Sequence, residues 1–434
     1  MRVLAKDMKS AAEAGSKNVE ALGWVHRIRE LGGVNFVILR DRSGSVQLVF
    51  NEKSPLTLES VIRVEGEPAL NDKAPGGAEL RVSKLEVLNQ AAPDLPYQVN
   101  GDPAKIGLDV LLDNRILSLR NPKIRAIFKV QAVIIESFSA YLRANDFTEI
   151  KTSKLVSGGT EGGTELFAVE YFEDKVYLAQ SPQFYKEVMV ASGLERVFEV
   201  APAYRAEKHD TPRHLNEYVS MDVEMGFIES ERDLIELEKG LLAFVFEELN
   251  KKCAEEIALW APQGASVPLP ESVATSPVLG HEEALAIANN EAAKYQKGRL
   301  FDINPEAEVR LCAWAEREHG SALVFVNEFP RRYRPFYTYP LDASRTMSFD
   351  ALFRGLEITT GGRRQHNYDD FIEVLPKFGL KPEFFPGYMM LLRHGCPPHG
   401  GFAIGCERLT AKILGIANVK EASLFPRDRK RITP

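Results

Sequence analysis

The sequence predicts an α+β fold, in which a small N-terminal β-barrel precedes a larger antiparallel sheet flanked by helices. Two stretches of the chain predict it. Residues 18–89 consist of short alternating segments separated by turn signals such as Ser43-Gly44 and Pro75-Gly76-Gly77, and about five such strands suit a small closed barrel. Residues 197–227 alternate on both sides of a polar, basic loop, which predicts an antiparallel hairpin with one apolar and one charged face.

The composition is that of a soluble globular protein. The chain has 434 residues, of which 44% are hydrophobic and 26% charged, and a net charge of −7, a size typical of two or three domains. No apolar run is long enough to span a membrane, and we expect a cytoplasmic protein that has no signal peptide and does not bind membranes. The four cysteines lie far apart and indicate neither a zinc site nor a disulfide framework. The acidic balance is not typical of a bulk nucleic-acid binder, although a local basic face is sufficient.

The predicted barrel occupies residues 1–92 and is typical of the oligonucleotide-binding (OB) fold. Phe36, Gln47 and Arg29 would form a surface for unpaired bases, because aromatic rings stack on bases and polar groups bind their edges. Without further context, a place in the barrel core explains Phe36 better. Residues 93–122 are rich in Pro, Asn and Asp, which predicts a linker to a domain at 123–434.

Helices and loops alternate with strands in this second domain. Residues 122–144 have helical spacing and precede a strand at 147–152, and residues 231–256 predict a strong amphipathic helix. Between them, the glycine-rich stretch from Ser157 predicts a mobile flap, with a plain solvent loop as the alternative. Ser181-Pro182 marks the start of another helix.

The C-terminal half begins with a mostly helical stretch. Residues 262–322 are expected to form a peripheral insert, followed by strands at ALVFVNEFP and FYTYP. The last segment, PPHGGFAIGCERLTAKILG, predicts a strand to Ile404, a tight turn at Gly405 and a helix that starts near Glu407-Arg408.

Two groups of charged residues indicate a polyphosphate site. In the hairpin, Arg205, Arg213 and His214 accompany Glu207 and Glu224, which suits phosphate because fixed cations match its oxygens and carboxylates orient the cations. The alternative is an amphipathic hairpin with a solvated outer face.

Further along the chain, acidic and basic residues lie together. Asp350 and Glu357 precede Thr360 and the pair Arg363-Arg364, which indicates a metal–phosphate or carboxylate site, with a solvated strand edge as the alternative. Arg408 at a helix N-terminus is better explained if it meets a phosphate, because that helix end favours anions.

The order of these features resembles that of class II aminoacyl-tRNA synthetases. YRAEKHDTPRHLNE is similar to motif 2 of that class and GCERL to motif 3, and residues 123–153 occupy the place of motif 1. With a barrel in front, the chain resembles the aspartate/asparagine/lysine subgroup over nearly its whole length. The resemblance implies an OB-fold anticodon-binding domain and a class II catalytic domain.

Within this subgroup, QSPQFYK at 180–186 resembles the aspartyl enzymes, whereas asparaginyl relatives carry a different sequence there and lack the lysine. Lys186 and Arg364 suit a side-chain carboxylate, because an amide would leave their positive charge unpaired. The compact chain and its end, FPRDRKRITP, resemble the archaeal-type form, which also occurs in some bacteria.

The resemblance assigns roles to individual residues. Arg205 and Arg408 would be catalytic, Arg205 by holding the α-phosphate and the attacking carboxylate. The residues matched to ATP binding are Arg205, Glu207, Arg213, His214, Tyr218, Glu357 and Arg408. Those matched to aspartate binding are Glu161, Ser181, Gln183, Lys186 and Arg364, and those matched to Mg²⁺ are Asp350, Glu357 and Thr360. The positions that fall on the anticodon side of the barrel are His26, Arg29, Phe36, Gln47 and Lys84, so the core interpretation of Phe36 loses ground.

The implied reaction is the ATP-dependent ligation of L-aspartate to tRNA through aspartyl-adenylate. The substrate carboxylate attacks the α-phosphate of ATP, and the aspartyl group then moves to the terminal ribose of the tRNA. No side-chain nucleophile is needed, because arginines and Mg²⁺ supply positioning and charge neutralisation. A homodimer is implied, and a tRNA-dependent amidotransferase would be a further partner if the asparagine tRNA is also charged.

Three positions depart from the family pattern. Ser153 stands where motif 1 normally has a proline, which puts the stiffness of the backbone there in doubt. Ala403 replaces the first glycine of the usual Gly-x-Gly of motif 3, and Thr360 replaces a commoner serine while keeping the hydroxyl.

The choice of tRNA depends on two conflicting residues. At the position of His26, enzymes that charge only the aspartate tRNA tend to carry Trp, and enzymes that also charge the asparagine tRNA tend to carry His. Lys84 matches a lysine of the strict kind instead. We favour charging of both tRNA(Asp) and tRNA(Asn), and the alternative is an enzyme that charges tRNA(Asp) alone. For His26 itself, the alternative is an exposed barrel residue that does not read the tRNA.

Two other classes of function remain as alternatives. A synthetase paralogue that makes a free amide without tRNA would have no use for the barrel. A non-catalytic binding module would be expected to lose some of Arg205, Glu207, Asp350, Glu357 and Arg408, all of which are present.

Overall fold

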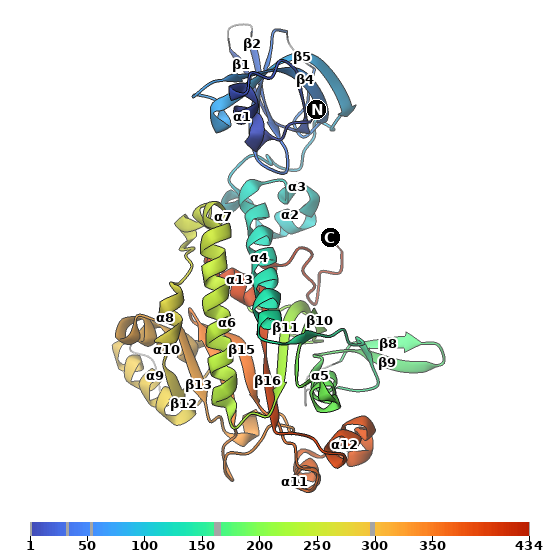
Figure 1. The fold of residues 1–434 in the computed structure, drawn as a ribbon, viewed down its shortest axis with the longest axis vertical. Coiled ribbons are helices and arrows are strands. Elements are labelled where there is room, and N and C mark those ends of the chain that lie inside the picture. Colours follow the sequence, from blue (N-terminus) through green and yellow to red (C-terminus); the bar gives the residue numbers. More distant parts are fainter. Residues whose placement is uncertain (1, 32–33, 53–54, 160–165, 296–299, 434) are drawn as a thin grey trace. The chain divides into compact units, whose positions relative to one another are not determined.

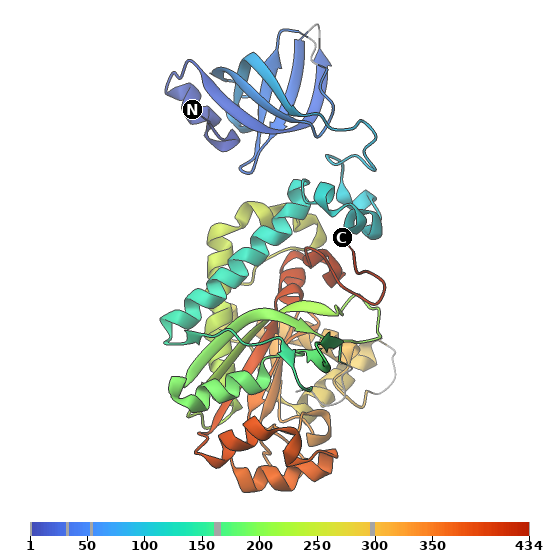
Figure 2. The same ribbon diagram turned by 90° about the vertical axis from the view of Figure 1, so that its right-hand side faces the viewer.

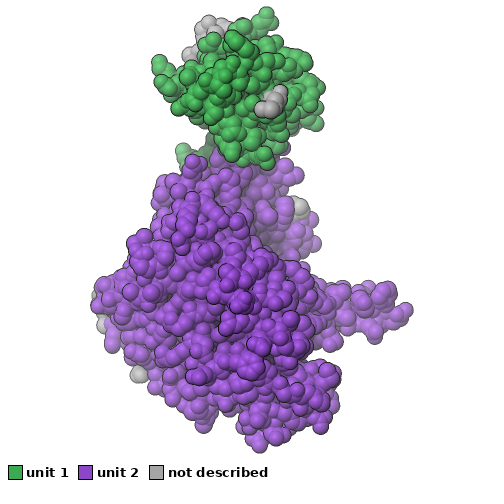
Figure 3. All heavy atoms as spheres, viewed as in Figure 1, with its two compact units in different colours: residues 1–105 green, residues 106–434 purple. Residues whose placement is uncertain are grey.

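The computed structural model describes residues 2–31, 34–52, 55–159, 166–295 and 300–433. The chain forms two compact units, residues 1–105 and residues 106–434, shown in different colours in Figure 3. The boundary between the units falls inside the stretch 93–122 that the composition predicts as a linker. In the described part of the chain, no helix combines the length and the apolar character that crossing a membrane requires.

The first unit is a closed five-stranded barrel with the strand order β1-β2-β3-β5-β4 (Figure 2). Its strands are β1 (Val19–Leu31), β2 (Val34–Arg40), β3 (Ser45–Phe50), β4 (Val61–Leu70) and β5 (Ala78–Asn89). Every second residue of β3 is buried, because the side chains of a strand alternate between the barrel core and the outside. The short helix α1 (Met8–Glu13) adds Met8 to this core. The predicted barrel is confirmed.

The second unit is built on one eight-stranded sheet with the order β12-β13-β14-β15-β16-β11-β10-β6. The strands pair antiparallel except at the two edges, where β12 pairs with β13 and β6 with β10 in parallel. The strands are β6 (Thr148–Glu149), β10 (Arg196–Tyr204), β11 (Glu217–Gly226), β12 (Val278–Gly280), β13 (Leu323–Asn327), β14 (Ser348–Phe353), β15 (Leu356–Arg363) and β16 (His399–Gly405). The predicted hairpin corresponds to β10 and β11, of which β11 pairs with β16 and β10 with the edge strand β6.

Two long helices, α4 (Pro122–Ala144) and α6 (Glu231–Lys252), lie together across one face of this sheet (Figure 1). Helix α4 starts where Asn121 caps the N–H of Lys123 and Pro122 takes the first position, and α6 starts with a capping box at Ser230. Both helices were expected from their apolar spacing.

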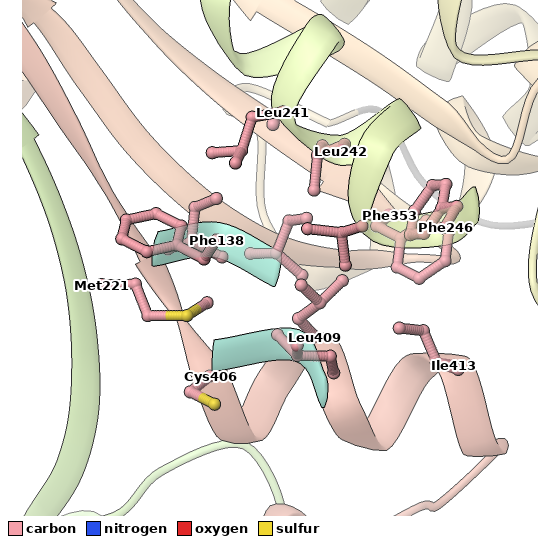
Figure 4. Packing of buried hydrophobic residues seen from close by; sticks show 14 of the residues in the cluster. Phe138, Met221, Leu241, Leu242, Phe246, Phe353, Cys406, Leu409 and Ile413 are labelled. Carbon is pink, nitrogen blue, oxygen red and sulfur yellow. The ribbon is translucent and has the colours of Figure 1, made fainter. Parts of the chain in front are cut away.

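Helix α13 (Cys406–Leu414) completes the core between these two helices and the sheet. Figure 4 shows how Phe138 of α4, Leu241 and Phe246 of α6 and Leu409 of α13 meet there. Truncation of a buried aromatic such as Phe138 to alanine lowers the free energy of unfolding by about 3–5 kcal/mol, so this core stabilises the packing of the helices against the sheet.

The remaining elements surround the sheet. A small three-stranded sheet consists of β7 (Leu155–Val156), β8 (Ala168–Tyr171) and β9 (Asp174–Leu178). The other helices are α2 (Leu108–Asp113), α3 (Arg115–Ser118), α5 (Gln183–Met189), α7 (Ala254–Ala258), α8 (Pro270–Ala274), α9 (His281–Tyr295), α10 (Pro305–His319), α11 (Tyr368–Val374) and α12 (Pro386–Arg393).

Three expectations differ from the structure. The predicted strand at 147–152 is reduced to the two residues of β6. FYTYP forms only isolated bridges, Thr338 with Arg364 and Pro340 with Thr346, because its neighbouring prolines cannot donate to a ladder. The stretch 262–322 is not wholly peripheral, since it supplies β12 to the edge of the central sheet.

Candidate active site

A cavity opens on the sheet where the β10–β11 connection, β15, β16 and the start of α13 meet. All seven residues that were matched to ATP binding line it, together with Thr360, Ser220, Ala403 and Glu407. These residues come from three separate stretches of the sequence, 205–220, 357–360 and 403–408, which the sheet brings together.

Arg205 directly follows β10, and its backbone is fixed on both sides. Its N–H donates to Asn216 at 2.9 Å, and the Asn216 side chain donates back to the carbonyls of Arg205 at 2.6 Å and of Glu207 at 3.0 Å. The Arg205 guanidinium lies 5.6 Å from the ring centre of Tyr218 and 3.9 Å from Glu207. These contacts therefore hold the guanidinium at the cavity wall, and the side chain does not extend into solvent.

His214 lies in the loop of the hairpin and faces the same cavity. Its Nδ1 is 2.6 Å from Thr211 Oγ1, and its Nε2 is 3.9 Å from Glu207. Burial lowers the pKa of His214 below its usual value. A neutral imidazole with one nitrogen toward the cavity can donate or accept one hydrogen bond.

Arg408 belongs to the first turn of α13 and reaches across to β15. Its Nη1 donates to the carbonyl of Glu357 at 2.9 Å and to its carboxylate at 3.2 Å. Next to it, both carboxylate oxygens of Glu407 accept the N–H of Val219 at 3.1 Å, while burial raises the pKa of Glu407 to about 7. Glu407 thus anchors the hairpin, and Arg408 faces the cavity.

The three residues matched to Mg²⁺ lie on neighbouring positions of β14 and β15. Asp350 is the Cα partner of Thr360, whose hydroxyl lies 3.4 Å from Glu357. Asp350 is buried, and within the described residues its Oδ1 has no hydrogen-bond partner. Burial, together with the charge of Glu357, raises the pKa of Asp350 to about 6 against the attraction of Arg334, 2.8 Å away.

A second polar cluster is buried behind the cavity. Lys186 of α5 lies 3.0 Å from Asp222 and 3.3 Å from Glu224, and Arg364 lies 2.9 Å from Glu224. The expectation that an amide substrate would leave these two positive charges unpaired is therefore wrong, because both cations already have carboxylate partners on β11. The solvated outer face considered for the hairpin is wrong for the same reason, since Asp222 and Glu224 are buried.

Glycine at position 401 is required by this cluster. A Cβ there would lie 2.2 Å from Glu224 Oε2 and 2.0 Å from the carbonyl of Val223. The Gly401 carbonyl in turn accepts from Arg364 at 3.0 Å. Because residue 401 has no side chain, the backbones of β11 and β16 can approach closely, and the Gly401 carbonyl can bind Arg364.

Glu187 organises the helix that carries Gln183 and Lys186. Its carboxylate is fully buried and accepts from Gln183 at 2.7 Å, from Tyr388 at 2.5 Å and from His399 Nε2 at 2.9 Å. The helix itself begins at Gln183, whose N–H lies 3.3 Å from Ser181 Oγ. These bonds fix which side chains of α5 face β11.

His399 is held as an imidazolium. Its Nε2 faces Glu187 and its Nδ1 faces the carbonyl of Pro397 at 2.9 Å, so both ring nitrogens act as donors. Burial disfavours the charge, but Cys396 and Glu187 outweigh it and raise the pKa of His399 to about 10. The contribution of this charge to stability is complete below about pH 6.5, where an unfolded histidine is also protonated, and is lost as the pH rises through about 10.

We expect His399→Gln to lower the free energy of unfolding at pH 7 by about 3–5 kcal/mol, because it leaves Glu187 as an unpaired buried charge. The variant should also lose the fall in stability that the wild type shows between pH 7 and 9.5. Urea unfolding across this pH range measures both effects, with His394→Gln, an exposed histidine, as the control. An unchanged pH dependence in the His399 variant would show that the imidazolium is not present.

In the barrel, three of the matched residues share the outward face of β1, β2 and β3. Arg29 is the Cα partner of Phe36, and Gln47 is the partner of Ile38, two residues along β2. Phe36 is half-buried between two buried neighbours, so it lies outside the core cluster and the core interpretation is wrong. Gln47 donates to Glu79 at 3.1 Å.

His26 and Lys84 lie apart from this face. His26 lies where the β1–β2 register shifts, and its Nδ1 is 2.9 Å from Arg40 Nη1. The guanidinium of Arg40 also pairs with buried Glu59 through Nη2, at 2.8 Å. Burial and the charge of Arg40 lower the pKa of His26. Lys84 belongs to the β4–β5 ladder and pairs with Glu65 at 2.8 Å. His26 is half-buried rather than exposed, and its reading role stays a prediction.

Other predicted positions have simpler outcomes. Glu161 and most of the predicted flap lie outside the described residues. Ser153 bonds the backbone of Leu155 through its hydroxyl, accepting its N–H at 3.2 Å and donating to its carbonyl at 3.0 Å, which restrains the chain where a proline is usual. Ala403 lies between Asp222 and Thr360 in the sheet and lines the cavity.

Sequence reasoning missed the buried partners of the site. Asp222, Glu187, His399 and Glu308 were not singled out, although each contacts a predicted residue. Glu224 was assigned to the polyphosphate site, whereas it pairs with Lys186 and Arg364. For Asp222 and Glu224, the charged face of an alternating strand was a signal, and its burial was not visible. Glu308 lies in an amphipathic helix and gave no signal.

Comparisons with known proteins agree with this geometry. Residues 107–429 match the model of class II tRNA synthetases (D, K and N), and residues 19–88 match the OB-fold nucleic-acid-binding domain. The chain is 49% identical to an aspartate–tRNA(Asp/Asn) ligase of Thermus thermophilus over the full length of both, and 38% identical to an aspartate–tRNA(Asp) ligase of Pyrococcus furiosus over 97% of each.

Among solved structures, asparaginyl-tRNA synthetase of Pyrococcus horikoshii in complex with asparaginyl-adenylate is similar to the whole chain, with a TM-score of 0.91 and 30% identity over 100% of both chains. A family model that spans the entire sheet domain, together with relatives that cover both units, confirms the resemblance. The chain belongs to the class II tRNA synthetases of the D, K and N group.

Proposed function

We propose that this protein ligates L-aspartate to tRNA in two steps. The α-carboxylate of aspartate attacks the α-phosphorus of ATP, which forms the mixed anhydride aspartyl-adenylate and releases pyrophosphate. A ribose hydroxyl of the terminal nucleotide of the tRNA then attacks the activated carbonyl, which forms the ester and releases AMP. Both steps need positioning and charge neutralisation rather than a protein nucleophile.

One observation carries the proposal: the carboxylate-binding cluster and the phosphate cavity are joined through Ser220. Ser220 lines the cavity, and its hydroxyl donates to Asp222 at 2.6 Å, while Asp222 holds Lys186 at 3.0 Å. A substrate whose side-chain carboxylate meets Lys186 and Arg364 therefore has its α-carboxylate directed toward Arg205.

The other matched residues take supporting roles. Gln183 and Glu161 bind the substrate ammonium, with Ser181 beside them, and Arg205 neutralises the α-phosphate as the pentacoordinate state forms. Arg213, His214 and Arg408 bind the β and γ phosphates, and Glu207 and Tyr218 bind the adenine.

Asp350, Glu357 and Thr360 would hold Mg²⁺, which would supply positive charge to neutralise the phosphates of ATP. The three donors are hard oxygens, the preferred ligands of this ion, and the buried Asp350 Oδ1 without a described partner is an oxygen that a cation would satisfy. The charge of Glu357 helps to raise the pKa of Asp350, and a cation bound near both carboxylates would offset this repulsion.

On the tRNA side, we propose that the protein charges both tRNA(Asp) and tRNA(Asn). His26 supports this choice, and so does the name of the Thermus thermophilus relative, whose 49% identity exceeds the 38% of the strict Pyrococcus furiosus enzyme. Lys84, which pairs with Glu65 at 2.8 Å, remains the opposing argument. A cytoplasmic homodimer that cooperates with a tRNA-dependent amidotransferase is part of the same proposal.

Pyrophosphate exchange with aspartate and with asparagine tests the first step. We expect exchange that depends on aspartate, with a kcat/KM for asparagine lower by at least about 10³-fold, because the amide NH2 would face the N–H donors of Lys186 and Arg364 without accepting a hydrogen bond. Exchange without transfer to any tRNA would favour the tRNA-independent paralogue, and no exchange at all would favour the non-catalytic module.

A further inference from the structure

Glu308 lies on α10, in a segment to which the sequence assigns no chemistry, yet its carboxylate contacts the proposed ATP site. Both of its carboxylate oxygens accept from Arg213 Nη2, at 2.7 and 2.6 Å. Only 5% of Glu308 is exposed, whereas Arg213 lines the cavity. The carboxylate therefore holds the arginine from behind.

The same carboxylate fixes a second residue of the cavity. Glu308 Oε2 accepts the backbone N–H of Glu357 at 2.9 Å. Here the β14–β15 ladder shifts register between Ala351 and Leu352, so the start of β15 needs a support outside the ladder. Because Arg408 binds the carbonyl and carboxylate of Glu357, Glu308 connects Arg213, Glu357 and Arg408 into one frame.

A purely structural role does not explain this arrangement well. Helix α10 is already attached to the sheet by apolar residues such as Leu311 and Ala315, and Asn304 caps its start. A buried ion pair contributes little net stability compared with apolar residues of similar volume. The negative charge of Glu308 is explained if its role is to keep Arg213 in a fixed position while Arg213 faces a ligand.

We propose that Glu308 is a positioning residue for the polyphosphate end of ATP, an inference that rests on the proposed ATP site. It holds Arg213 through one guanidinium nitrogen, and in the described part of the chain Nη1 and Nε of Arg213 have no hydrogen-bond partner. These N–H groups are available for phosphate oxygens. By fixing the N–H of Glu357, Glu308 also sets the relation between the phosphate-binding arginine and the carboxylate proposed to bind Mg²⁺.

Nucleotide binding by the full-length protein tests this role, with ATP and AMP as probes in the presence of Mg²⁺. We expect Glu308→Gln to weaken ATP binding about 10-fold, since a charge-assisted anchor becomes a neutral one, and to change AMP binding less than twofold. The KM for aspartate should also change less than twofold. Glu306→Gln, on the same helix but paired with Arg310 away from the cavity, is the matched control and should leave both affinities unchanged.

Two further variants separate the possible failures. Arg213→Ala should weaken ATP binding by itself, and adding Glu308→Gln to it should cause little further loss, because the two residues act through one contact. If Arg213→Ala leaves ATP binding unchanged, the proposed role of Arg213 is wrong and the role of Glu308 falls with it. If Arg213→Ala weakens binding but Glu308→Gln does not, or weakens ATP and AMP equally, only the positioning role is overturned.

Should Glu308→Gln fail to fold, Glu308→Asp replaces it in the same assays. Aspartate keeps the charge but is one methylene shorter, so it should weaken ATP binding without changing AMP binding. An Asp variant that folds and binds ATP like the wild type would contradict the proposal, because the distances from Arg213 and Glu357 would then be unimportant.

Discussion

Replacing Arg205 with alanine should lower the rate of aspartate-dependent pyrophosphate exchange by about 10²–10³-fold, with little change in the stability of the fold. Arg205 faces the cavity from a backbone that Asn216 fixes on both sides, so its cation is in place before the negative charge of the transition state develops. Removal of one such preorganised group typically costs this factor in kcat.

Steady-state exchange kinetics at saturating ATP and aspartate measure this effect. Arg205→Lys should recover only part of the loss, because an ammonium cannot bind two oxygens in the fork geometry of a guanidinium. Arg196→Ala is the control, since Arg196 is exposed at the far end of the same strand. An Arg205→Ala variant that retained exchange within threefold of the wild type would remove this residue from the chemistry.

Replacing Arg364 with glutamine should have the second large effect, on both folding and substrate binding. The variant leaves Glu224, which is fully buried, without its closest cation, at a cost of about 3–5 kcal/mol in the free energy of unfolding. The KM for aspartate should rise by at least about 10-fold, because a charged hydrogen bond to its side-chain carboxylate is lost.

A double variant, Arg364→Gln with Glu224→Gln, separates the two effects. Removing both charges should restore most of the stability, since no unpaired ion remains buried, but it should not restore the KM for aspartate. Urea unfolding and exchange kinetics on the same preparations provide the two measurements. Recovery of the wild-type KM in the double variant would mean that Arg364 only balances Glu224 and does not contact the substrate.

Much of the fold follows from local patterns. The bounds of α4 agree with the sequence because Asn121 and Pro122 specify its start and its apolar spacing is regular. The hairpin of β10 and β11 could be predicted since alternation continues on both sides of one polar loop. FYTYP does not form the predicted strand, because its aromatic residues favour pairing whereas the neighbouring prolines cannot donate to a ladder.

The buried half of the site could not be predicted in the same way. Alternation marks Asp222 and Glu224 as one face of a strand, but which element covers that face depends on the long-range contacts of α5 and of the segment after β15. His399 and Glu187 are 212 residues apart along the chain, and no local sequence pattern connects them. The cavity residues were easier, because a family motif names them by spacing alone.

The most direct test of the central claim is aminoacylation of tRNA(Asp) and tRNA(Asn) transcripts, assayed in parallel with the purified protein and labelled aspartate. We predict that both transcripts accept aspartate with comparable kcat/KM and that neither accepts asparagine. Charging of tRNA(Asp) alone would contradict the proposed dual specificity, and failure to charge either transcript would contradict the ligase itself.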